Sequence, residues 1–308
     1  MATKEHKQQV SIANDLIKSA QGLNIGEKRL LMLAVSKLDS KIKPSIQGAA
    51  VSISVAEMVE MFGLNSDKAY QEAKKAAEGI MKRQIRIKPN NADSELIQWV
   101  GKSKYNKGEG WILVEFYYGL FPYLFELKSH FTSYRLSRAS GLQSVYSWRL
   151  FELLMQFKKT GLLNILIDDF HHSLETPKTY HADFSLLKAR VIEPAVKEIR
   201  EKDGLAVEWE AIKAGRKVKA LKFTFPTEQQ LSLDTHPKAL NSANTPRTEQ
   251  GAKTKKGAKQ EIEAFLSLSE TKSRLQSAKE LARLAKVPAE TYLTEKDRAS
   301  IAHYELTI

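Results

Sequence analysis

The sequence predicts an α+β fold in which helices followed by a β-hairpin occur twice along the chain. Apolar residues recur every three or four positions in the helical segments, whereas residues 205–212 and 217–225 alternate as strands do. Two helices separated by a tight turn and followed by a hairpin are typical of a winged helix-turn-helix. We therefore expect two winged-helix domains in tandem (10–139 and 140–227), then a flexible linker (228–258) and a helical tail (259–308).

The composition limits the class of protein. A length of 308 residues with 42% hydrophobic residues suits two domains and a tail, with enough apolar material for a core. No apolar run approaches the roughly 20 residues that span a bilayer, and the N-terminus lacks the apolar segment of a signal peptide. The absence of cysteine excludes disulfides, thiolate zinc sites and thiol nucleophiles. We expect a cytoplasmic protein without membrane contact.

The charge favours an acidic partner. The formal net charge is +12, with a pI near 9.5. Residues 231–308 hold 13 Lys/Arg against 10 Asp/Glu, a net of +3, so +9 of the +12 lies in the first 230 residues. A surplus of this size on folded domains points to phosphate groups, and therefore to nucleic acid. The alternative is that the surplus only aids solubility.

The first domain is expected to open with helices at 14–20 and 27–38. In the second of these, Leu30, Leu33, Ala34 and Leu38 form the inner face, and Lys28, Arg29 and Lys37 are expected outside. A short strand at 51–54 leads into a capping box, in which Ser54 and Glu57 bond each other's backbone N–H. The helix that this box starts should end at Gly63.

The next helix, 67–82, follows that glycine turn and completes the first helix-turn-helix. Its inner face is expected to hold Tyr70, Ala73, Ala77, Ile80 and Met81. The cations expected on its surface, as nonspecific DNA contacts, are Lys68, Lys74, Lys75, Lys82 and Arg83. A hairpin (96–101 and 111–116) follows, then a short helix at 122–127 and an extended piece at 132–136.

The second domain begins with a helix through Gln156, closed before Gly161. A strand at 165–167 and a helix capped by Asp168 or Asp169 lead to the key helix. There Phe184, Leu187, Val191, Ala195 and Ile199 make one apolar stripe. Pro194 removes a backbone donor from this helix, so we expect a kink or a fresh helical start there.

The final hairpin should bury one face, because Val207, Trp209 and Ala211 share parity with Leu221, Phe223 and Phe225. Both Trp148 and Trp209 lie on such apolar faces, so we expect core residues and not base-stacking platforms. Five cations lie between Lys213 and Lys222 with no acidic residue among them. The hairpin therefore presents a basic tip.

These elements predict how the second domain would meet DNA. Lys188 and Arg190 are the candidates for reading bases, since an arginine can bond guanine O6 and N7 together. Lys178, His181 and Ser185 near the helix start, and Lys197 further along, could contact phosphate or base. At the hairpin tip the expected phosphate contacts are Lys213, Arg216, Lys217 and Lys219. A merely solvated set of surface cations is the alternative for each group.

Catalysis is poorly supported. His171 and His172, with Tyr180 nearby, could suggest a nicking endonuclease, which uses two histidines around a metal and a tyrosine nucleophile. Adjacent side chains diverge by about 100° on a helix and point to opposite faces of a strand, so the pair would not face one metal. No phosphate-binding loop of the form Gly-x-x-x-x-Gly-Lys-Ser/Thr occurs. We expect no catalytic residue, no metal and no cofactor.

The combination of segments resembles the iteron-binding plasmid replication initiators over residues 10–227. The stretches that carry the resemblance are Ser147–Leu154, Phe184–Arg200, Gly215–Val218 and Leu221–Phe225, together with Asn14–Ser40 and Phe131–Leu136. The resemblance implies an initiator whose monomers bind directly repeated sites in double-stranded origin DNA and whose dimers repress its own gene. It also implies host initiator and helicase-loading proteins as partners.

By the same resemblance, the second domain would supply the base contacts, through Lys188 and Arg190, and backbone contacts through the hairpin. The first domain would add phosphate contacts and the dimer interface. A stand-alone transcriptional repressor, without initiation activity, is the alternative that the sequence leaves open. The tail lies outside the resemblance.

Overall fold

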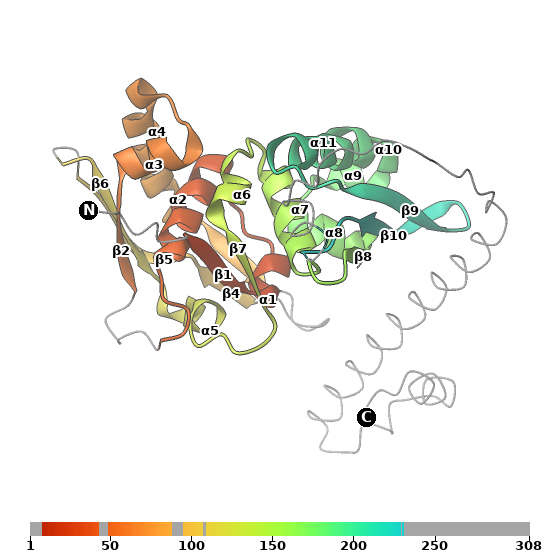
Figure 1. Ribbon diagram of the computed structural model, residues 1–308, viewed down its shortest axis with the longest axis horizontal. Helices are drawn as coiled ribbons and strands as arrows, with labels where there is room; N and C mark the ends of the chain where they lie inside the picture. The colour runs from red at the N-terminus through yellow and green to blue at the C-terminus, as the bar shows by residue number, and fades with distance from the viewer. Residues whose placement is uncertain (1–7, 43–48, 88–94, 107–108, 229, 231–308) are drawn as a thin grey trace, which may run out of the picture. The chain divides into compact units, whose positions relative to one another are not determined.

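The computed structural model describes residues 8–42, 49–87, 95–106, 109–228 and 230 (Figure 1). Apart from Glu228 and Gln230, the expected linker (228–258) and helical tail (259–308) lie outside the described residues. Within the described ranges, no helix is both long enough and apolar enough to cross a bilayer.

One arrangement of elements occurs twice, which confirms the two tandem winged helices. Each copy runs helix, strand, two helical elements and a hairpin, and its first strand pairs antiparallel with its last, in the sheet orders β2-β6-β5 and β8-β10-β9. The first copy holds α2 (Ile25–Ser36), β2 (Ala50–Ser54), α3 (Val55–Phe62), α4 (Ser66–Ile80), β5 (Val100–Asn106) and β6 (Trp111–Phe116).

The second copy begins with α7 (Val145–Met155), β8 (Leu162–Leu166) and α8 (Ile167–Leu174). A run of short helical pieces follows, then the hairpin of β9 (Glu208–Ala214) and β10 (Lys217–Thr224), which Figure 1 shows in cyan. Trp209 pairs with Phe223 and Ala211 with Leu221, as the shared parity predicted. Trp148 is fully buried, and Trp209 is partly buried against the same core.

The remaining elements lie outside the repeat. β1 (Gln9–Ala13) pairs antiparallel with β7 (Phe131–Arg135), and β3 (Gln84–Ile87) with β4 (Glu95–Gln98). The helical elements are α1 (Asn14–Lys18), the 3₁₀ turn η1 (Tyr118–Leu120), α5 (Phe121–Leu124) and α6 (Leu136–Ser140). β7 is the extended piece expected at 132–136, and α5 is the short helix expected near Pro122, ending sooner than predicted.

The turn between α3 and α4 is built as the sequence predicted. Ser54 and Glu57 form the reciprocal capping box, and α3 ends at Gly63, whose φ of 59° is a left-handed conformation that glycine adopts without strain. However, Tyr70 on α4 is 51% exposed, and Met81, just after the end of α4, is 39% exposed, so the inner face is narrower than expected. Small alanines, Ala73 and Ala77 among them, form most of the buried side and allow a close approach to α2.

Two further predictions about helix starts were wrong. α2 begins at Ile25, two residues before the expected start at residue 27, because Asn24 and Glu27 form a capping box, so Gly26 lies inside the helix. Asp168 and Asp169 lie in the first turn of α8, whose N-cap residue, Leu166, makes no side-chain bond. There the carboxylates face the positive end of the helix dipole instead of capping it.

The outer face of α2 is the largest departure from the sequence-based expectation. Lys28 and Arg29 were expected in solvent, yet both are buried, with Lys28 at 0% exposure. The Arg29 guanidinium donates to the carbonyl of Leu142 and to Gln143, so it reaches the start of the second domain. A helical stripe in one segment does not reveal that another domain covers the opposite side.

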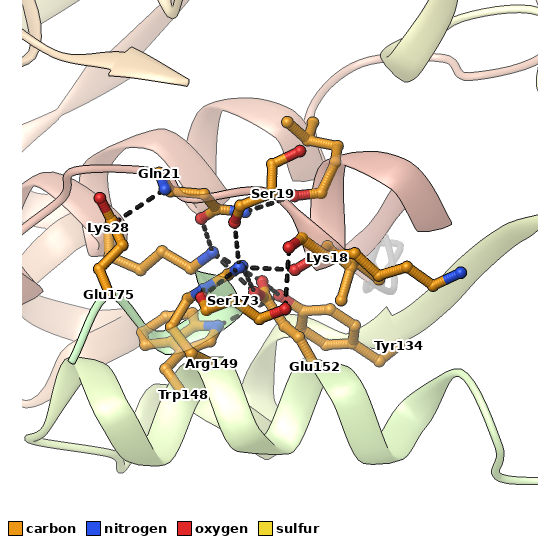
Figure 2. Close-up of polar contacts among 12 residues, drawn as sticks. Lys18, Ser19, Gln21, Lys28, Tyr134, Trp148, Arg149, Glu152, Ser173 and Glu175 are labelled. Carbon is orange, nitrogen blue, oxygen red and sulfur yellow. Dashed lines mark hydrogen bonds and ion pairs between the residues drawn. The ribbon is translucent and has the colours of Figure 1, made fainter. Parts of the chain in front are cut away.

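Lys28 enters a buried polar cluster that joins the two winged helices (Figure 2). Its ammonium group lies 2.8 Å from the carboxylate of Glu152 on α7 and donates to Gln21. Glu152 also accepts from Tyr134 and, at 3.0 Å, from Arg149. Burial is the main reason that the pKa of Lys28 falls to about 8, although Glu152 raises it. Burial also raises the pKa of Tyr134.

Arg149 extends this cluster to the backbone of the first domain. Its guanidinium donates to the carbonyls of Ile17 in α1 and of Ser19 just after it, and to the carbonyl of Ser173 at the end of α8. Glu175 accepts from the backbone N–H of Gln21 and Gly22. Every charge in the cluster thus has partners, as buried charges require. We call Lys28, Tyr134, Arg149 and Glu152 the junction cluster.

We predict unequal effects of substitutions in the junction cluster. Glu152→Gln removes the one carboxylate that faces both Lys28 and Arg149, and should lower the free energy of unfolding by about 3–5 kcal/mol. Lys28→Met should cost less, because Glu152 keeps Arg149 and Tyr134 as partners. Urea unfolding of the full chain measures both.

Glu78→Gln is the control, because Glu78 forms an exposed ion pair with Lys74 at 3.7 Å. It should cost less than about 1 kcal/mol. Equal losses for Glu152→Gln and Lys28→Met would contradict the central role given to the carboxylate.

Candidate nucleic-acid interface

The helical run that follows α8 is the best candidate for entering a DNA groove. It consists of α9 (Lys178–Ala182), α10 (Phe184–Leu187), a π-helical segment η2 (Lys188–Ile192) and α11 (Glu193–Lys202). We call α10, η2 and α11 together the recognition run. The predicted apolar stripe is confirmed, with Leu187, Val191, Ala195 and Ile199 buried and Phe184 partly buried. The opposite side of the recognition run is open to solvent.

Pro194 marks a change of helix type in the recognition run, but not the fresh helical start that the sequence predicted as one alternative. Ile192 and Glu193 before it keep right-handed helical dihedrals, so the run continues from the π-helical segment into α11 without a break. Immediately before it, the backbone widens into η2, and the N–H of Glu193 bonds the carbonyl of Lys188, five residues back. Single π-helical turns inside helices are found frequently at functional sites.

The exposed side of the recognition run carries the predicted base-reading residues. Arg190 is exposed and has no ion pair among the described residues. Lys188 is half exposed and lies 3.4 Å from Glu193, and Lys197 lies 3.8 Å from Glu201. Such exposed pairs are weak and can exchange for a phosphate or a base.

The residues predicted around the start of the recognition run have different surroundings. Lys178 is exposed on α9. The Ser185 hydroxyl donates to Asp183, the N-cap residue of α10. The ring of His181 stacks on His171 with centroids 3.8 Å apart, so one face of His181 is occupied by the protein itself. Burial, followed by His181, lowers the pKa of His171 to about 4, which keeps His171 neutral.

The β9–β10 hairpin forms a wing with a basic tip. Gly215 takes a φ of 63° in the turn, and Lys213, Arg216, Lys217 and Lys219 around it are exposed. None of these four has an ion pair within the described ranges. The fifth cation of this stretch, Lys222, pairs with Glu210 on the adjacent strand at 2.9 Å. Residues directly opposite in antiparallel strands meet regardless of their separation in sequence.

In the first domain, the predicted cations of the α4 region are less uniformly available. Lys68, Lys75 and Lys82 are exposed and have no ion pair within the described part of the chain. Lys74 pairs with Glu78, and Arg83 with the buried Glu27 at 2.8 Å. Arg83 therefore helps to fix α4 and β3 against α2, where Glu27 caps the helix.

The structure adds candidates that the sequence analysis did not single out. Lys102 and Lys104 lie two apart on β5, which puts both on one face of the first domain's own wing, and Lys104 lies over the Trp111 ring. Leu186 (38% exposed) and Ala189 are apolar and open on the recognition run, as a contact to a thymine methyl requires. The spacing of Lys102 and Lys104 along a strand could have identified this pair from the sequence.

The histidines considered for nicking lie on α8, where His171 is buried and His172 partly buried. Among the residues that the structure describes, no group of three or more His, Cys, Asp or Glu lies close enough to hold a metal ion.

Two protein-family models match this chain. A family model described as initiator replication protein, WH1, matches residues 9–155, and one described as initiator Rep protein, WH2, matches residues 166–225. A replication initiation protein of Escherichia coli is 28% identical over 230 residues, or 72% of this chain and 71% of that protein. An uncharacterized 27.6 kDa protein of Escherichia coli is 23% identical over 221 residues, 68% of this chain and 92% of that protein.

Among solved structures, the Pi initiator protein in complex with iteron DNA superposes with a TM-score of 0.62. The match covers 73% of this chain and 99% of that chain at 22% identity, so the likeness is one of fold. The repeated winged helix is therefore the arrangement found in that protein.

We predict that the free cations of the wing hold the DNA backbone. Lys217→Ala should weaken binding to a random-sequence duplex and reduce the slope of log affinity against log salt by about 1. Lys222→Ala should change both quantities less, because Glu210 already neutralises Lys222. Fluorescence anisotropy between low and moderate salt measures this, and equal effects of the two variants would contradict it.

Proposed function

Because this chain belongs to the replication initiator family with tandem WH1 and WH2 domains, we propose that it initiates plasmid replication by binding directly repeated sites, iterons, at the origin. The observation that carries the proposal is the exposed basic surface of the second domain, made by the recognition run and the wing. The iteron DNA bound by the Pi initiator, which has the same fold, is consistent with this partner.

The recognition run and the wing would make different kinds of contact with DNA. The recognition run would enter the major groove, where Lys188 and Arg190 can reach base edges. The four cations of the wing would hold phosphates and fix the register of the protein on the duplex. Phosphate contacts from the first domain would add affinity but little sequence preference, and binding as a whole would fall steeply with salt.

Binding of several copies to adjacent repeats would bend the origin and help to open a neighbouring AT-rich segment. The bound protein would then recruit host initiator and helicase-loading proteins. Dimers formed through the first domain would repress the chain's own gene, in equilibrium with the monomers that bind iterons. In this scheme the protein acts in the cytoplasm by binding alone, without a catalytic residue, metal or cofactor.

A stand-alone transcriptional repressor is the second candidate, favoured by the fact that a winged helix suits either task. A plasmid without its own origin, carrying this gene and its flanking DNA, separates the two. We expect it to replicate in a suitable host, and to fail when the flanking repeats are deleted. Tight binding to the repeats without replication in any host tested would favour the repressor.

The division of labour within the second domain has its own test. Arg190→Ala should cost about 1–3 kcal/mol of binding free energy on the flanking repeat and little on random DNA. Lys217→Ala should weaken binding to both duplexes about equally. Competition binding at one salt concentration measures the affinity of each variant for each duplex. If the two variants lose affinity in the same way on both duplexes, the assignment of base reading to Arg190 and of phosphate contact to Lys217 is wrong.

A further inference from the structure

The recognition run contains an ion pair with an unusual spacing. Lys188 and Glu193 are five residues apart, and their side chains meet at 3.4 Å while each remains about half exposed. Residues five apart on a regular α-helix point about 140° away from each other. The other ion pair of the run, Lys197–Glu201, has the ordinary spacing of four. The Lys188–Glu193 pair thus depends on a local departure from the α-helix.

The π-helical segment η2 supplies that departure. Its bond from the N–H of Glu193 to the carbonyl of Lys188 spans five residues, so the two residues at its ends come onto one face. The cause is next in sequence: Pro194 has no N–H to give, and its ring would collide with the carbonyl of Arg190 in a continuous α-helix. Pro194 therefore aligns Lys188 with Glu193.

The chemistry of an acid at this position is selective. A carboxylate in the major groove accepts a hydrogen bond from the N4 amino group of cytosine, and it repels phosphates and the acceptor edge of guanine. Glu193 lies three residues from Arg190 and five from Lys188, and it starts α11 at the middle of the recognition run. An acid that served only solubility would not need to lie among the base-reading cations.

We propose that Glu193 is a specificity-determining residue, which the π-helical segment positions beside Lys188 to read one or two base pairs of the binding site. In the free protein Glu193 holds Lys188 in an exposed ion pair. On the correct sequence, a cytosine amino group replaces Lys188 as the partner of Glu193. A guanine or a phosphate replaces Glu193 as the partner of Lys188. On other sequences the carboxylate is left facing acceptors, and binding is disfavoured. The inference rests on the proposed function, since it requires the recognition run to lie in a groove.

Selection from a pool of randomised duplex DNA tests the inference, because the selection itself identifies the preferred motif. The full-length protein should enrich one motif. Glu193→Gln keeps the size of the side chain and removes its charge, and it should enrich the same motif with base preference lost at one or two adjacent positions. For Glu193→Gln, the affinity for duplexes altered at those positions should differ from the affinity for the enriched motif by less than about 2-fold. For the unsubstituted protein the same change should reduce the affinity by about 10-fold or more.

Glu201→Gln is the matched control, because it removes one exposed acidic charge from the same helix, paired with a lysine in the same way. It should leave the motif intact, even if affinity for all DNA rises. Relaxation at the same positions by Glu201→Gln, or an intact motif with Glu193→Gln, would overturn the proposal.

Pro194→Ala provides a second, independent variant. Alanine restores the missing N–H and favours a continuous α-helix. Base preference should therefore be lost at the same DNA positions as with Glu193→Gln, and the thermal stability of the protein should not fall. An intact motif in a folded Pro194→Ala protein would show that the π-helical segment does not position Glu193. If the unsubstituted protein enriches no motif at all, the proposed function fails, and this inference with it.

Discussion

The carboxylate of Glu152 is the group on which the arrangement of the two winged helices depends. It is fully buried between a lysine from α2 and an arginine from its own helix, and Tyr134 donates to it as well. The Arg149 guanidinium carries the connection on to backbone carbonyls of the first domain. Since a buried charge without a partner is very costly, these groups can be accommodated only together. The basic surfaces of the two domains are thereby held on a shared support.

The sequence predicted those features that depend on short-range periodicity or on the chemistry of one residue. The parity of Trp209 with Phe223, the capping box at Ser54 and the departure from the regular α-helix beside Pro194 all belong to this kind. In each case the deciding neighbours lie within a few residues or on the adjoining strand of a hairpin, so the pattern is complete in the local sequence.

Two departures from expectation depended on a neighbour that lies far along the chain or across a hairpin. Lys28 was expected in solvent because nothing near it in the sequence reveals Glu152, 124 residues away. Lys222 looked free because its partner, Glu210, lies across the hairpin. The candidate site shows the same dependence on structure. Its exposed cations could be identified from the sequence. The contact between Lys188 and Glu193 could not, because it depends on the π-helical segment.

Pro194 has a consequence for how such a protein can change over time. Nearly any other residue at this place would allow a regular α-helix, and most would be better helix formers. Substitutions that make the helix more regular would therefore be accessible by single steps and would not be removed by loss of folding. Only selection for the correct binding site would retain the proline. Under the proposal, folding would not require a proline at this position, whereas recognition would, as is common where function requires an irregular backbone.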